Sequence, residues 1–394
     1  MKFLKMLCGI LACFLVLPAV SQEVNHSKVP GRMVAYSPQS SGKYIGSPSI
    51  TILEDGTYLA SHDFFGPESN EHVRATSRVY RSSNKGRTWT QIAEIDGAFW
   101  SKLFTHQGKT YFLGTDRHHG NTLIRRSDDG GFTWTEPTDK NNGLLLEGEY
   151  HCAPMPVIEH NGRLWRTMES AMGPIKKWGK RYGAMMLSVP VDADLLQADS
   201  WTASEVLYYD STYLDGNFGG WLEGNAVVDP QGQLWNILRV DDRSTLEEKA
   251  AMVKVSMDGK KAMFSEESGF IPFDGGSKKF TIRYDSLSER YWTIANHIPE
   301  EVKAAHPKRS PSGIRNTQAL FSSPDLKNWT MHKILLQHDD VVYHGFQYVD
   351  WLFEGKDIVF LSRTAYDDGV GGARNNHDAN YLTFHRIKKF RKLK

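Results

Sequence analysis

The sequence predicts an all-β fold, a β-propeller of six blades, on three observations. A short turn motif that ends in tryptophan recurs along the chain, and short turns, five of which contain glycine, separate pairs of apolar segments at six places. No long stretch shows the periodicity of a helix. A count of seven blades stays open, because irregular blades are difficult to recognise in a sequence.

The recurring motif has the spacing Ser-x-Asp/Asn-x-Gly-x-Thr-Trp. It occupies residues 82–89 and 127–134, and a shortened copy occupies residues 323–329. The Asp or Asn accepts backbone hydrogen bonds inside a tight turn, the Gly adopts a conformation closed to most residues, and the Trp covers the apolar layer below. We therefore expect each copy to join two outer strands of a sheet, with Trp89, Trp134 and Trp329 buried beneath the turns.

Each blade is expected to start with a strand, a glycine turn and a second strand. The turns are predicted at residues 55–56, 107–108, 161–162, 231–232, 286–290 and 354–355. The preceding strands are predicted at 49–53, 102–105, 153–158, 225–228, 280–284 and 345–353, and the following strands at 58–61, 111–115, 164–168, 234–238, 291–295 and 358–362. Residues 29–36 are predicted to pair with residues 384–387 and to close the ring.

The first 21 residues are predicted to be a signal peptide. Lys2 and Lys5 precede an apolar run, and small residues mark a cleavage site near Gln22. The run is too short to span a bilayer comfortably, so a membrane anchor is disfavoured, and Cys13 leaves lipidation as a minor alternative. We expect a secreted or periplasmic monomer whose residues 22–394 form one propeller domain.

Composition excludes several other classes of protein. The mature chain would keep a single cysteine, Cys152, which excludes an intrachain disulfide and a cysteine metal site. The formal net charge is +1, and the basic tail at residues 386–394 is expected to be a solvated end, so nucleic acid is not an expected partner. No membrane span is expected either. No cofactor is expected.

Strand direction predicts which end of the propeller carries function. Glycine turns and tryptophan turns share one face of an antiparallel meander, and residues that enter the inner strands or leave the second strands share the other. This second face collects ionisable groups, so a pocket is expected there. The groups are His62, Asp63, Asp116, His118, His119, Tyr150, His151, Glu169, Glu223, Asn225, Arg239, Asp241, Asp242, His297, Tyr343, His344, Gln347 and Arg363.

Arginines in this set indicate an acidic ligand. Arg239, Arg363 and Arg374, with Arg315 as a fourth candidate, come from several blades of a chain with almost no net charge. A planar guanidinium suits a carboxylate held through two hydrogen bonds, as in a uronic acid. The alternative is that each arginine supports the structure by pairing with a nearby Asp. A Gly-rich loop that contains His377 is a further part of the predicted site.

Proton transfer is assigned to histidines or to carboxylates. His62, supported by His151, is the first choice as general acid or base, because imidazole titrates near neutral pH. Asp63 and Glu169 are the carboxylate candidates for glycoside chemistry, beside Asp116, Glu223 and Asp241. The predicted substrate-binding residues are Tyr150, Glu223, Asn225, Arg239, Asp241, His344, Gln347, Arg363, Arg374 and His377. No metal is expected, because side chains of adjacent residues such as His118 and His119 diverge on an extended chain.

The tryptophan turns resemble the Asp-box, or BNR, repeat of sialidase-superfamily β-propellers, and this resemblance covers essentially the whole mature chain. It implies a sialidase-like propeller. Sialidases of this kind carry an Arg in a Phe/Tyr-Arg-Ile-Pro element of the first blade, which holds the sialic-acid carboxylate. The matching stretch here, Tyr44-Ile45-Gly46-Ser47-Pro48, has no Arg. Sialidase activity is therefore not expected.

Four segments, at residues 46–49, 61–66, 150–154 and 373–381, resemble secreted propellers of Bacteroidetes, and among these the α-L-rhamnosidases of glycoside hydrolase family 145. That resemblance implies an exo-acting hydrolase that removes terminal rhamnose next to a glucuronic acid and relies on a histidine. By context His62 matches best, and His106 or His160 would match if the opposite face were used.

Two other functions stay open. Related propellers include uronate-specific lyases and dehydratases, in which Arg239 would neutralise the carboxylate while His151 and Tyr150 move the C5 proton. A glycan-binding propeller without catalysis is the third hypothesis, and it would show affinity without turnover.

Overall fold

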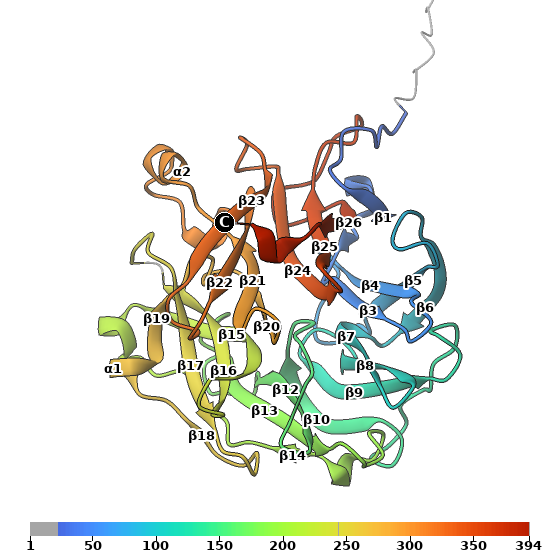
Figure 1. The fold of residues 1–394 in the computed structure, drawn as a ribbon, viewed down its shortest axis with the longest axis vertical. Helices are drawn as coiled ribbons and strands as arrows, with labels where there is room; N and C mark the ends of the chain where they lie inside the picture. Colours follow the sequence, from blue (N-terminus) through green and yellow to red (C-terminus); the bar gives the residue numbers. More distant parts are fainter. Residues whose placement is uncertain (1–22, 243, 394) are drawn as a thin grey trace, which may run out of the picture.

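The computed structural model describes residues 23–242 and 244–393, and in these residues it is built almost entirely of antiparallel strands (Figure 1). Two short α-helices, α1 (Glu266–Gly269) and α2 (Glu300–Ala305), are the only ones in this part of the chain. Neither is long and apolar enough to cross a membrane. The all-β prediction is confirmed. The predicted signal peptide, residues 1–21, lies outside the described residues.

The strands form five hydrogen-bonded sheets arranged around a common centre (Figure 1). The first sheet contains β2 (Tyr44–Ile45), β3 (Ser49–Ile52), β4 (Tyr58–Phe65), β5 (Thr76–Ser82) and β6 (Thr90–Asp96). The second contains β7 (Phe99–His106), β8 (Lys109–Thr115), β9 (Gly120–Ser127), β10 (Leu144–His151), β11 (Ile158–His160), β12 (Arg163–Ser170), β13 (Gly183–Pro190) and β14 (Thr202–Ala203).

The third sheet contains β15 (Phe218–Val228), β16 (Leu234–Asp242), β17 (Lys249–Val255), β18 (Ala262–Met263) and β19 (Phe270–Pro272). The fourth contains β20 (Thr281–Asp285), β21 (Arg290–Asn296), β22 (Thr317–Ser323) and β23 (Thr330–Gln337). The fifth contains β24 (Gly345–Glu354), β25 (Asp357–Ala365), β26 (Tyr381–Ile387) and β1 (Arg32–Tyr36).

The eight-stranded sheet consists of two meanders, β7 to β10 and β11 to β14. Only Tyr150 and His151 of β10, beside Ser170 and Glu169 of β12, join them. We interpret the two meanders as separate blades, which would give six blades in all. The ring closes as the sequence predicts, because β1 pairs antiparallel with β26, from Arg32 beside Phe384 to Tyr36 beside Tyr381.

All six predicted turns connect a first strand to a second strand. The strand before the third predicted turn, β11, differs from its prediction, because it covers only Ile158–His160 rather than residues 153–158. Pro154 and Pro156 lie in the missing part. Proline has no N–H to donate to a sheet ladder, which explains the late start of this strand.

The tryptophan turns lie where they are predicted, between outer strands, and in each of them the indole N–H donates to the backbone carbonyl three residues earlier. In the second copy, the Ser127 hydroxyl accepts the Gly131 N–H at 2.9 Å, and Trp134 Nε1 donates to the Gly131 carbonyl at 3.0 Å. The expected full burial is wrong: all three indoles are half-buried, because each covers its cluster from the rim.

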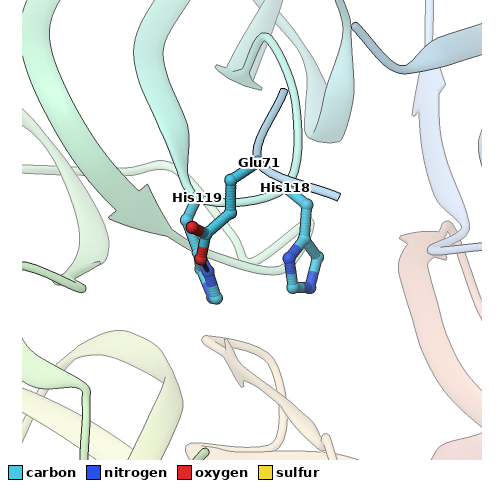
Figure 2. A group of neighbouring side chains, drawn as sticks. All are labelled: Glu71, His118 and His119. Atoms are coloured by element: carbon cyan, nitrogen blue, oxygen red, sulfur yellow. Dashed lines mark hydrogen bonds and ion pairs between the residues drawn. The ribbon is translucent and has the colours of Figure 1, made fainter. Parts of the chain in front are cut away.

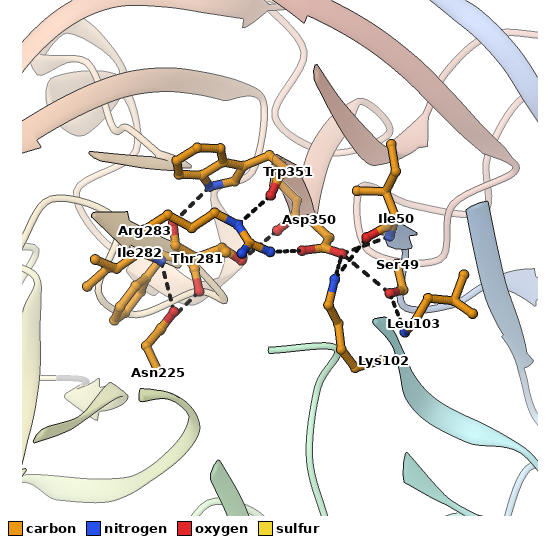
Figure 3. Close-up of polar contacts among 12 residues, drawn as sticks. Ser49, Ile50, Lys102, Leu103, Asn225, Thr281, Ile282, Arg283, Asp350 and Trp351 are labelled. Carbon is orange, nitrogen blue, oxygen red and sulfur yellow. Dashed lines mark hydrogen bonds and ion pairs between the residues drawn. The ribbon is translucent and has the colours of Figure 1, made fainter. Parts of the chain in front are cut away.

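A buried carboxylate, Asp350 on β24, connects the inner strands near the centre of the ring (Figure 3). It forms an ion pair with Lys102 of β7, accepts the Ile50 N–H of β3 at 2.8 Å, and lies 3.5 Å from Arg283 of β20. Burial alone would raise the pKa of Asp350, but Lys102, Arg283 and Lys279 hold it below its usual range. One carboxylate thus binds strands from four of the five sheets.

We predict that Asp350→Asn lowers the free energy of unfolding by about 3–5 kcal/mol, because Lys102 and Arg283 would remain buried without their counter-charge. Denaturant titration measures this change. Asp199→Asn is the control: Asp199 pairs with Lys140 at 3.5 Å with both side chains largely exposed, so its loss should be below about 1 kcal/mol. Equal effects of the two variants would contradict the role of Asp350.

Candidate active site

A cavity of about 140 Å³ lies at the face that the sequence predicts, where second strands end and inner strands begin. It is lined by Gly46, Ser47, Asp63, Phe65, Phe99, Trp100, His118, His151, Trp178, Tyr182, Leu222, Glu223, Tyr348, Arg363 and His377. Five of these residues belong to the predicted site: Asp63, His151, Glu223, Arg363 and His377. The structure therefore brings together side chains that are far apart in the sequence.

Three inner strands bulge at the cavity. The register of β7, β15 and β24 shifts at Trp100, Glu223 and Tyr348, respectively. Each of these residues has a positive φ, of 50°, 56° and 54° in this order, which is strained for a residue other than glycine. Bulges redirect side chains next to functional sites. The three residues with strained backbone are thus residues whose side chains line the cavity.

Sequence reasoning missed Trp100 and Tyr348. Neither is a charged residue, and a bulge at a non-glycine residue leaves no turn signal in the sequence. A signal that could have found them is their spacing from polar residues: Lys102, Asn225 and Asp350 each follow a bulged residue by two positions, and all three are buried. Residues two positions apart on a strand point to the same face of the sheet. The repeated spacing therefore marks equivalent positions in the three strands.

Three buried guanidinium groups surround the Tyr348 end of the cavity. Arg239 forms an ion pair with Glu223 at 2.9 Å, and Arg315 donates to the Gln347 side chain at 2.7 Å. Arg363 lies over the Tyr348 ring at 4.7 Å. Burial, together with the charges of Arg239 and Arg363, lowers the pKa of Arg315 to about 10. Asp241 acts on Arg239, and Asp378 acts on Arg363, so carboxylates outside the cavity offset part of this positive charge.

Glu223 is ionised in this cluster. Burial alone would raise its pKa, but the charge of Arg239 and its hydrogen bond hold the pKa below the usual range. Arg374, which was predicted to join the cluster, lies apart from it: its side chain is 47% exposed and donates to the Tyr44 hydroxyl at 2.9 Å. The third arginine of the cluster is Arg315 instead.

Asp63 is a second acidic group that lines the cavity. Its two oxygens accept the Ser47 N–H and the Trp100 N–H, each at 2.6 Å. Burial nevertheless raises the pKa of Asp63 to about 6. Gly46 makes room for this carboxylate, because a Cβ at that position would lie 1.5 Å from Asp63 Oδ1. The arrangement fixes a carboxyl group that can hold a proton near neutral pH.

His151 and Glu169 form a buried pair beside Asp63, as the pairing of β10 with β12 requires. His151 Nδ1 lies 2.7 Å from Glu169 Oε2, and Glu169 Oε1 accepts the Gly224 N–H at 3.2 Å. The His151 ring packs against Trp100 and Tyr182. Glu169 is not among the residues that line the cavity, so it orients His151 from behind.

His62, the first choice for proton transfer, does not line the cavity. Its ring is buried inside its own sheet, with Nδ1 2.9 Å from the Asp63 carbonyl oxygen and Nε2 3.2 Å from the Tyr80 hydroxyl. Burial lowers its pKa to about 4. Successive residues of a strand point to opposite faces. Asp63 therefore lines the cavity, whereas His62 packs against Phe64 and Tyr80 of its own sheet.

Other predicted residues support the site without lining it. Gln347 donates to the carbonyl oxygens of Asn376 and His377, and Asn225 joins β15 to the Ile282 N–H of β20. Tyr150 is buried in an apolar cluster, and Asp241 packs against Gly219. His344 stacks on His338 with ring centroids 3.6 Å apart, away from the cavity.

His118 and His119 contradict the expectation that their side chains diverge. They lie in the turn between β8 and β9, where His119 has a φ of 55°, and their ring centroids are 4.2 Å apart. The turn replaces the extended conformation on which the expectation depended. Glu71 lies beside both imidazoles (Figure 2).

A larger groove of about 750 Å³ lies at the end of the glycine turns and includes His160. Two of its polar groups are committed to local structure: Asp229 accepts the Gln231 and Gln233 N–H groups, and the Tyr291 hydroxyl donates to the Val228 carbonyl. His106 hydrogen-bonds to the Val191 carbonyl. The smaller cavity is therefore the better candidate for chemistry.

No family model and no curated protein sequence matches this chain. Solved structures do. An α-L-arabinanase from Penicillium chrysogenum complexed with arabinobiose is 14% identical, with 93% of this chain and 99% of that chain covered and a TM-score of 0.55. A mutant α-L-arabinofuranosidase from Fusarium graminearum with an iminosugar inhibitor is 11% identical, with 92% and 98% covered and a TM-score of 0.59.

A Hadza microbial sialidase is 15% identical, with 91% of this chain and 68% of that chain covered and a TM-score of 0.59. At these identities the likeness concerns the fold. The chain has the fold of sialidase-like β-propellers, as the sequence predicts.

We predict that Gly46→Ala displaces the Asp63 carboxylate from the Ser47 and Trp100 N–H groups, which lower its pKa, and so raises this pKa further above about 6. Carboxyl ¹³C NMR titration measures this pKa. Gly313→Ala is the matched control, because the nearest atom to its new Cβ would be 3.6 Å away. An unchanged Asp63 titration in the Gly46 variant would show that the close approach does not position the carboxylate.

Proposed function

We propose that this protein is an exo-acting glycoside hydrolase that removes a terminal sugar from acidic oligosaccharides or polysaccharides. The observation that carries the proposal is the charge arrangement of the cavity. Three buried guanidinium groups act on Tyr348 and Glu223, and Asp63 holds a proton near neutral pH. The names of the similar structures, an arabinanase, an arabinofuranosidase and a sialidase, support glycoside hydrolysis.

The size of the cavity favours removal of a single terminal sugar. Its volume of about 140 Å³ is well below the range of about 300–1,000 Å³ for drug-sized ligands, so it admits one sugar ring rather than a chain segment. Trp100, Trp178 and Tyr182 offer aromatic surface for the apolar face of the ring. A predicted signal peptide would bring such an enzyme to polysaccharides outside the cytoplasm.

The three guanidinium groups favour a carboxylate on the substrate. Arginine binds carboxylates through two parallel hydrogen bonds, and its attraction is strong in a buried site. A uronic acid meets this requirement. Our specific hypothesis, from the family resemblance, is a terminal α-L-rhamnose next to a uronic acid. The alternative is a terminal uronic acid, whose carboxylate would itself enter the cavity.

The residues suggest a two-step reaction with retention. Asp63 donates its proton to the glycosidic oxygen as the bond to the anomeric carbon breaks, while the Tyr348 hydroxyl attacks that carbon and Glu223 takes the phenolic proton. Water, deprotonated by Asp63, then displaces Tyr348, which recovers its proton from Glu223. A neutral phenol suits this role because a carboxylate nucleophile would repel the carboxylate of the substrate.

The test of the proposed function uses the mature protein with rhamnose-capped and uronate-capped acidic oligosaccharides. Products are identified by mass, and unsaturated uronate by its ultraviolet absorbance. We expect a free terminal sugar without that absorbance. Appearance of the absorbance would favour the lyase alternative, and binding without turnover would favour a glycan-binding propeller.

We predict that kcat/KM falls as pH rises through about 6, because the free enzyme must carry a proton on Asp63. Asp63→Asn should remove this limb of the pH profile and lower kcat/KM by about 10²-fold or more on unactivated substrates. The exposed Asp199→Asn is the control and should keep both. A pH limb that persists in folded Asp63→Asn would assign the proton to another group.

A further inference from the structure

We propose that Glu71, His118 and His119 form a binding site for a divalent transition-metal ion such as Zn²⁺. One ligand atom from each residue lies within 4.8 Å of the other two (Figure 2). Glu71 comes from the segment between β4 and β5, and the histidines come from the turn between β8 and β9. Two imidazoles and one carboxylate are a ligand set that Zn²⁺ uses in proteins.

Small movements bring the three groups to bonding distance. Zinc bonds to nitrogen and oxygen are about 2.0–2.2 Å long, so a bound ion would draw the ligand atoms closer together than they are here. Glu71 can supply this movement, because its side chain is 39% exposed. The His118 ring makes no hydrogen bond to any described residue, so its nitrogens need not give up a protein partner.

Neighbouring groups hold the ligands in place. His119 Nδ1 lies 2.7 Å from Glu71 Oε1, and Nε2 lies 3.0 Å from the Tyr182 hydroxyl. A metal ion on Nδ1 would take the place of the shared proton, and Nε2–H would donate to Tyr182. Such partners on the second ring nitrogen orient histidine ligands in metal sites.

Charge near the site is balanced. Arg181 donates to Glu71 Oε1 at 2.5 Å and, through its other terminal nitrogen, to Glu149 at 2.8 Å. Lys176, largely exposed, contacts Glu149 at 3.0 Å. Two carboxylates and two cations cancel, so a dication would enter neutral rather than positive surroundings.

The ion would lie at the edge of the cavity. His118 lines the cavity, and its ring centroid is 5.1 Å from that of Trp100. Three protein ligands leave a coordination position for water or for a substrate oxygen. The ion would also connect the Glu71 segment to the β8–β9 turn, and it is not needed in the hydrolytic steps.

The experiment measures Zn²⁺ binding to the chelator-treated mature protein by calorimetry, without substrate, so its outcome does not depend on the proposed function. We expect one ion per chain. His118→Ala and His119→Ala should each weaken binding by at least about tenfold. His72→Ala is the matched control, since His72 is exposed on the same segment as Glu71, and it should bind as the parent does.

X-ray absorption of the zinc-loaded parent protein provides a test that needs no variant, and it should show two imidazole ligands. The proposal is overturned if the parent binds no Zn²⁺, if its spectrum lacks imidazole, or if His72→Ala weakens binding as much as His118→Ala.

Discussion

The Asp350 carboxylate, buried where the inner strands meet, is the interaction on which the arrangement of the site depends. It contacts β3, β7 and β20 from its own strand, β24, and so fixes the relative height of strands that share no hydrogen-bonded ladder. Lys102, Lys279, Arg166 and Arg283 are buried near it and carry more charge than one carboxylate neutralises. Burial lowers the pKa of Lys279 to about 7, which relieves part of this excess.

The same polar layer explains how strained residues are held in the cavity. Tyr348, Trp100 and Glu223 stand two positions before Asp350, Lys102 and Asn225, and in each strand the later residue is tied to a neighbouring strand. A strained backbone persists only where its surroundings fix it on both sides. Each bulge therefore lies between a side chain that lines the cavity and a buried polar residue, two positions later, that is hydrogen-bonded to a neighbouring strand.

Much of the fold could be predicted from the sequence because its signals are local. A Gly turn or a Ser-x-Asp-x-Gly-x-Thr-Trp turn is specified by a few adjacent residues, so the strand order and the closure of β1 on β26 followed from them. Charged residues at strand ends predicted Asp63, Glu223, Arg239 and Arg363. Tyr348 and Trp100 depend on bulges fixed by distant strands, and His62 and Asp63 could not be distinguished without knowing which alternate residue faces inward.

Glu71 shows a second limit of prediction from the sequence. It lies between strands, nearly fifty residues before His118, and only the folded chain brings the two side chains together. The choice of cavity likewise depends on the fold, because both ends of the propeller carry histidines and carboxylates.

The most direct test of the account is a crystal structure of the mature protein with a bound uronic acid. We expect the sugar ring in the cavity near Trp100 and Tyr348, with its carboxylate beside the guanidinium group of Arg363, which lines the cavity. A sugar bound instead in the groove beside His160 and Tyr284, with the cavity filled only by water, would contradict it.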